Sequence, residues 1–253
     1  MRIMNSNRKI AIGTGVSTER VPMTSLRKTS LAAGILYLLT FVSIPTLALY
    51  RSIHDPNYIL GTGPDTAVII GNILEIIVAL TGIGTAVALY PVLKRQNEGI
   101  ALGLVSSRVL EAATIFAGVL FLLTVVTLRQ TAAGAQTLVT SHTLITMYDR
   151  MFLIGQSFMP AINDLLLGFL LYQTRLVPRG LSLLGLIGGP VLLVGDISVL
   201  FGIIGQHEPS TALFAVPVAL FEFSLGIYLI FKGFNSTSTE NDVPDQIIQF
   251  GRD

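Results

Sequence analysis

Six long apolar stretches constrain the fold of this chain more than any other feature of its sequence. A helix needs about 20 apolar residues to cross about 30 Å of hydrocarbon. Six runs reach that length, at 29–50, 66–93, 99–128, 150–173, 181–204 and 212–231. The runs are continuous rather than alternating, so they are typical of helices and not of β-barrel strands. We therefore predict an all-α fold, an integral membrane bundle of six spanning helices.

The charge content agrees with a lipid environment. Charged residues make up 12% of the 253 residues, about half the roughly 25% that is usual in soluble domains. A net charge of +1 argues against nucleic acid as a partner, because such a partner would require a basic face. The chain contains no cysteine, which excludes disulfides, thiolate catalysis and iron–sulfur clusters. The predicted partner is the lipid bilayer, and no cofactor is predicted.

Positive charges indicate how the bundle is oriented. With a cytoplasmic N-terminus, the inner segments hold Arg2, Arg8, Lys9, Arg20, Arg27, Lys28, Lys94, Arg95, Arg175, Arg179, Lys232 and Arg252. The outer loops then hold only Arg51 and Arg129. Cytoplasmic loops of membrane proteins carry an excess of Lys and Arg. The predicted topology is N-in and C-in, in a bacterial plasma membrane.

The two ends of the chain differ in composition from the apolar middle. Residues 1–27 are basic and polar without an apolar core, so they predict a cytoplasmic leader rather than a signal peptide. Residues 233–253 are rich in Ser, Thr and acidic residues and predict a disordered cytoplasmic tail. The six-span membrane domain accordingly covers residues 28–232.

Several motifs carry a family resemblance. They are ALYPVLK at 88–94, NEGIALG at 97–103, RVLE at 108–111, YDR at 148–150, and the run 170–189. Together they resemble a large family of bacterial multi-pass membrane proteins catalogued as a domain of unknown function, over residues 27–233. The resemblance implies fold and location only. It carries over no catalytic or binding residue.

Acidic side chains inside the apolar runs are the first candidates for a functional site. A carboxylate at the bilayer centre costs about 2.5–3.5 kcal/mol on insertion scales. Glu75, Asp196 and Glu222 lie at similar depth, eight to ten residues from the outer side of their helices. We predict that they form a layer that binds protons, cations or another ligand. The alternative is that they are structural groups, hydrogen-bonded to polar side chains of neighbouring helices.

Arg108 and Glu111 are a second candidate pair. Their spacing of i and i+3 puts both on one face of a helix, which predicts a structural ion pair. Pro45, Pro160, Pro190 and Pro217 also lie inside the apolar runs, and each removes a helix hydrogen bond. The sequence Gly188-Gly189-Pro190 is the expected site of a helix break.

The three histidines, His54, His142 and His207, fall in three different predicted outer loops. They are secondary candidates for a metal site, since imidazole is a common zinc ligand. No metal is assigned, because HExxH and similar ligand spacings are absent from the sequence. Asp149 is predicted to cap the fourth membrane helix.

Three functions therefore remain open. The first is a small permease or transporter that uses the outer carboxylates. The second is a structural, sensory or assembly subunit of a membrane complex, without transport or catalysis. The third is an extracytoplasmic metal-binding membrane protein. The sequence has no P-loop and no GxSxG motif, so an enzyme is not indicated. A homo-oligomer or a further membrane partner is compatible with all three functions.

Overall fold

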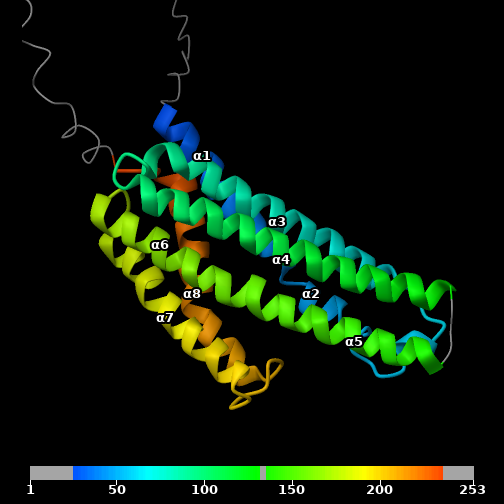
Figure 1. Ribbon diagram of the computed structural model, residues 1–253. Helices are drawn as coiled ribbons and strands as arrows, with labels where there is room; N and C mark the ends of the chain where they lie inside the picture. Colours follow the sequence, from blue (N-terminus) through cyan, green and yellow to red (C-terminus); the bar gives the residue numbers. More distant parts are fainter. Residues whose placement is uncertain (1–24, 132–134, 236–253) are drawn as a thin grey trace, which may run out of the picture.

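The structure is a computed structural model that describes residues 25–131 and 135–235, and its regular elements are all helices (Figure 1). In chain order they are α1 (Ser25–Thr40), η1 (Phe41–Ser43), α2 (Thr46–Leu49), η2 (Tyr58–Leu60), α3 (Thr66–Leu93), α4 (Glu98–Thr131), α5 (Ala135–Phe152), η3 (Leu153–Phe158), α6 (Met159–Thr174), α7 (Arg179–Leu200) and α8 (Pro209–Phe231). Six helical units of the described chain are long and apolar enough to span a membrane. The predicted all-α membrane bundle is confirmed. Most of the predicted leader and tail, at 1–24 and 236–253, lies outside the described residues.

The spanning helices pack as a closed ring. Helix α1 contacts α3, α3 contacts α4, α4 contacts α6, α6 contacts α7, α7 contacts α8, and α8 returns to α1. Apolar side chains from α3, α4, α6 and α8, among them Leu89, Leu104, Leu167 and Phe221, fill part of the interior. Polar groups that point into this ring are therefore shielded from both lipid and bulk water.

Two glycines allow the first and last helices to close the ring. A Cβ atom added to Gly34 of α1 would lie 2.8 Å from the carbonyl oxygen of Gly226 on α8, closer than packed atoms tolerate. Arg27 at the start of α1 also donates a hydrogen bond to the carbonyl of Leu229, at 2.9 Å, and another to the carbonyl of Ile230. The contact between α1 and α8 is thus held by both backbone proximity and hydrogen bonds.

The helix pair α4 and α5 is longer than predicted. The predicted outer loop at 129–149 is wrong, because most of this segment is helical. Polar residues fill it, but Leu138, Ile145 and Tyr148 pack against Leu122 and Val125 of α4. The helical unit 136–174 has 39 residues, about 58 Å at 1.5 Å per residue, well beyond the hydrocarbon thickness. This apolar stripe explains why a polar segment forms a helix.

The helix irregularities lie elsewhere than expected. Helix α7 runs through Pro190 without interruption, so the predicted break there is wrong. Added Cβ atoms on Gly188 and Gly189 would lie 3.1 Å and 2.7 Å from the backbone of α8 and α6 respectively, which indicates that these glycines serve close packing. The irregular turns are instead the 3₁₀ segment η1, just before Pro45, and the π-helical segment η3, just before Pro160.

The two ends of the bundle differ in charge. One end, called here the basic end, contains the start of α1, the α3–α4 and α6–α7 connections and the end of α8 (Figure 1). In the described chain it carries Arg27, Lys28, Lys94, Arg95, Arg175, Arg179 and Lys232. The other end, called the histidine end, carries Arg51, Arg129 and Arg150 together with His54, His142 and His207.

Candidate functional site

Arg108 of α4 lies in the interior of the ring, with only 3% of its side chain exposed. Its Nη1 donates to Glu111 on the same helix, at 3.0 Å from Oε2. Its Nη2 donates to Oε1 of Glu222 on α8, at 2.8 Å. The i, i+3 geometry expected for Arg108 and Glu111 is therefore present, and Glu222 extends the pair across the ring.

Three further side chains surround this charged group. Asn163 of α6 donates to Oε2 of Glu111 at 2.6 Å, and Tyr37 of α1 has its ring beneath the Arg108 guanidinium. Asp164 of α6 is fully buried, and neither of its carboxyl oxygens has a hydrogen-bond partner in the described chain. It interacts electrostatically with Arg108, Glu111 and Glu222. We call this set the Arg108 cluster: Tyr37, Arg108, Glu111, Asn163, Asp164 and Glu222.

The charges of the Arg108 cluster do not balance. Three carboxyl groups face one guanidinium, so full ionisation would give three negative charges against one positive, a net charge of −2. An uncompensated buried charge costs several kcal/mol even after relaxation. Bound protons or a cation would offset this excess negative charge.

A cavity of about 180 Å³ adjoins the cluster. Its wall includes Arg108, Glu111 and Glu222, the segment 40–44 where α1 becomes irregular, and Gln156 of η3. At about 30 Å³ per water molecule, this volume holds about six waters. It is smaller than the roughly 300–1,000 Å³ of pockets for metabolites and drug-sized ligands. The cavity suits water and small ions.

The segment η3 connects the other two membrane carboxyls. Gln156 donates to Oε1 of Glu75 on α3, at 3.1 Å, and Tyr148 donates to the same oxygen at 2.6 Å. The neighbouring Ser157 donates to Oδ1 of Asp196 on α7, at 2.6 Å. The second oxygens of Glu75 and Asp196 are buried and have no hydrogen-bond partner among the residues that the structure describes. Two adjacent residues of η3 thus contact carboxyls on two different helices.

The three residues of the predicted carboxylate layer occupy separate settings. Within the described chain, no hydrogen bond joins any two of Glu75, Asp196 and Glu222, and each has its own partners. Glu222 belongs to the Arg108 cluster, whereas Glu75 and Asp196 bind η3. Tyr37 and Tyr148 also belong to these networks, although neither was among the site residues predicted from the sequence. Both side chains are buried, with 1% of Tyr37 and 4% of Tyr148 exposed, and this burial depends on how distant helices pack.

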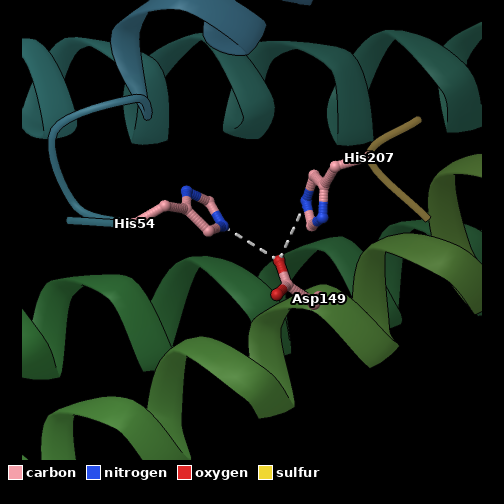
Figure 2. Close-up of side chains that lie close together, drawn as sticks. All are labelled: His54, Asp149 and His207. Carbon is pink, nitrogen blue, oxygen red and sulfur yellow. Dashed lines mark hydrogen bonds and ion pairs between the residues drawn. The ribbon is translucent and has the colours of Figure 1, made fainter. Parts of the chain in front are cut away.

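The histidine end brings together two of the three histidines (Figure 2). Nε2 of His54 lies 3.1 Å from Oδ1 of Asp149, and Nε2 of His207 lies 3.6 Å from the same oxygen. The placement of His142 in a loop is wrong: it is exposed on α5, two turns or about 10 Å from Asp149. The capping role of Asp149 is also wrong, because Asp149 lies well inside α5 and contacts the two histidines.

The connection before α3 is fixed by a second polar network at this end. Asp65 accepts hydrogen bonds from Tyr58 (2.6 Å), Gln130 (2.9 Å) and Arg129. Burial alone would raise the pKa of Asp65, but these hydrogen bonds outweigh it and hold the pKa below its usual range. At His54, the hydrogen bond to Asp149 raises the imidazole pKa, and partial burial opposes that rise.

The comparisons with known proteins give one match. The family described as "Domain of unknown function (DUF4386)" matches residues 32–233, which is most of the chain and all but the first residues of the ring. No curated protein and no solved structure matches the chain. The expected relationship to a domain-of-unknown-function family is confirmed.

Proposed function

The chain belongs to the DUF4386 family, whose description assigns no activity, and we propose from its interior site that it is a small permease that conducts protons or small cations through the Arg108 cluster. The observation that carries this proposal is a water-sized cavity lined by Arg108, Glu111 and Glu222, with the buried Asp164 close enough to interact electrostatically with all three. Ionisable groups inside membrane proteins typically mark ion or proton pathways.

Asp164 is the strongest single support for this proposal. A purely structural carboxyl gains its stabilisation from hydrogen bonds, since an unpaired buried polar group costs about 1–3 kcal/mol. Asp164 is fully buried without such a bond in the described chain, and the other two carboxyls of the cluster already outnumber its single guanidinium. A group that takes up and releases a proton, or a cation that binds between Asp164 and Glu222, accounts for this otherwise unfavourable position.

The irregular helices support the same function. Both the 40–44 segment and Gln156 of η3 line the cavity. Helix interruptions free backbone groups and are a common device for ion sites near the middle of a membrane, and π-helical turns are frequent at functional sites. Gln156 also reaches Glu75, so η3 offers a polar route from the Arg108 cluster toward the histidine end.

The charge asymmetry of the bundle supports an orientation for this transport. The basic end carries most of the Lys and Arg outside the ring interior, which favours a cytoplasmic position for that end and for both termini. The proposed location is the plasma membrane of a bacterial cell, with the histidine end facing outward.

The proposal is tested by ion flux in proteoliposomes that contain a pH-sensitive dye. A potassium gradient with valinomycin provides the driving force for protons, and sodium and potassium gradients test cation movement. The expected result is flux above that of protein-free vesicles, abolished by Glu222→Gln or Asp164→Asn. The matched control is Glu98→Gln, the same change at an exposed site on α4, which should retain full flux. Absence of flux, or equal flux in Glu222→Gln and the wild type, refutes the proposal.

A structural subunit is the second candidate function, and a specific observation favours it. The polar contacts join different helices: Arg108 joins α4 to α8, Tyr148 joins α5 to α3, and Ser157 joins η3 to α7. Each such bond between membrane helices contributes about 0.6–2 kcal/mol. If the flux assay fails and each carboxyl-to-amide variant is less stable than the wild type, this function replaces the first.

A further inference from the structure

The histidine end contains a cluster that the proposed ion pathway does not use. His54 follows α2, Asp149 lies on α5, and His207 lies in the α7–α8 connection (Figure 2). Three segments distant in sequence thus bring two imidazoles and one carboxylate to one point. We propose that His54, Asp149 and His207 form a binding site for a divalent transition metal ion of the zinc type.

The separations of the ligand atoms fit such an ion. Two ligand atoms that each lie about 2.0–2.1 Å from a tetrahedral zinc ion are about 3.3 Å apart. The two Nε2–Oδ1 distances, 3.1 Å for His54 and 3.6 Å for His207, lie on either side of this value. The three ligand atoms all lie within 4.8 Å of one another. Small side-chain rotations therefore suffice to bring all three to bonding distance.

The orientation of His54 is the second argument. Its Nδ1 lies 2.8 Å from the carbonyl oxygen of Tyr50, an acceptor, so Nδ1 carries the proton. In the neutral imidazole, Nε2 then presents a lone pair toward the Asp149 carboxylate. The two atoms lie 3.1 Å apart, so either a proton on Nε2 or a metal ion bound by both atoms satisfies the contact, and the metal ion can also take Nε2 of His207 as a ligand. A backbone carbonyl that fixes the tautomer in this way is the usual outer partner of a metal-binding histidine.

His207 is held near the other two residues but remains accessible. Its neighbour Gln206 donates a hydrogen bond to the backbone carbonyl of Asp149, at 2.7 Å, which fastens the α7–α8 connection to α5. The His207 side chain is 65% exposed, so an ion can enter from the aqueous phase. Three protein ligands leave at least one coordination position for water, as in exchangeable or catalytic zinc sites.

The ligand types select the class of ion. Calcium and magnesium prefer sets of oxygen ligands, whereas two imidazole nitrogens with one carboxylate suit zinc and its first-row neighbours. Such an ion would cross-link the connection after α2, helix α5 and the α7–α8 connection. The site is separate from the Arg108 cluster, so its existence does not depend on the proposed transport.

The test is a titration of the full-length, detergent-purified protein with Zn²⁺, after metal is removed with a chelator and the chelator is removed by desalting. Calorimetry should give one Zn²⁺ per chain, and the thermal unfolding temperature should rise with added Zn²⁺. His54→Ala and His207→Ala should each weaken binding at least about tenfold, since even outer partners of metal ligands contribute 10–100-fold. The matched control is His142→Ala, an exposed histidine outside the cluster, which should bind like the wild type.

His207→Ala separates metal binding from folding. Because His207 is mostly exposed, this variant should unfold at the wild-type temperature without metal and lose only the rise caused by Zn²⁺. Cobalt offers an independent readout, because Co²⁺ bound to nitrogen and oxygen ligands gives visible absorption bands that His207→Ala should remove. No stoichiometric Zn²⁺ binding, or equal binding in His54→Ala, His207→Ala and the wild type, overturns the proposal. The His54–Asp149 contact would then be an imidazolium–carboxylate ion pair only.

Discussion

Replacement of Arg108 should destabilise the bundle far more than replacement of the glutamate it contacts. Arg108→Gln leaves Glu111, Asp164 and Glu222 buried without their guanidinium. Loss of one partner from a buried ion pair costs about 3–5 kcal/mol, which corresponds to about a hundredfold to several thousandfold in the unfolding equilibrium. Glu222→Gln keeps an amide oxygen where the 2.8 Å hydrogen bond from Arg108 ends, and Arg108 retains Glu111. Glu222→Gln should therefore lower the free energy of unfolding by less than about 1.5 kcal/mol.

The measurement is reversible unfolding in mixed micelles with increasing SDS, followed by far-ultraviolet circular dichroism, since the chain has no tryptophan for fluorescence. A double variant tests the cause. If stranded carboxylates produce the defect, Arg108→Gln combined with Glu111→Gln should be more stable than Arg108→Gln alone. Equal stability of Arg108→Gln and Glu222→Gln, or an added loss in the double variant, would refute the charge-balance reasoning.

Three other predictions concern the rest of the bundle. In the cysteine-free chain, an impermeant maleimide added to intact cells should label Asn57→Cys but not Gln96→Cys, and the reverse pattern would invert the proposed topology. Because the pKa of Asp65 is lowered in the folded state, its stabilisation is present above pH about 4 and is lost as the pH falls below that value. Thermal unfolding should show Asp65→Asn less stable than the wild type at pH 7, with a gap that closes in acid; a gap independent of pH contradicts this. Gly34→Ala should cost about 1–3 kcal/mol through the clash with α8, measured by thermal unfolding, whereas Gly180→Ala, with open space around the added Cβ, should cost nothing; equal behaviour of the two variants would be inconsistent with the close approach.

Local patterns in the sequence were sufficient for the spans and for one side-chain pair. Apolar run length determines which segments cross a membrane, and the i, i+3 spacing brings Arg108 next to Glu111 in any helix. Both features depend only on neighbours in the chain. The family relationship was also visible locally, in the motifs around the α3–α4 connection.

The remaining features depend on contacts between distant segments. Glu222 meets Arg108 only because the ring places α8 opposite α4, and depth along a helix does not specify which side of the ring a residue faces. The helical character of 136–149 depends on packing against α4, because its Thr, Ser and Gln residues are otherwise typical of a loop. His54 and His207 come together through two connections whose lengths alone do not define their path.

Because α8 closes the ring last, Arg108 is synthesised and inserted before its partner Glu222 exists. Helix α4 enters the membrane long before α8, and 114 residues separate Arg108 from Glu222. Until α8 is inserted, an unpaired Arg108 would cost about 2.5–3.5 kcal/mol at the membrane centre. Glu111, three residues further along α4, is the partner that enters the membrane on the same helix. If Glu111 neutralises Arg108 during insertion, Glu111→Gln should lower the membrane integration of a nascent chain that ends after α4. Glu222→Gln should leave integration of the full chain unchanged, and equal integration of the wild-type and Glu111→Gln fragments would exclude this role. The arginine is neutralised first within its own helix, and its partner on the last helix arrives only when the ring closes.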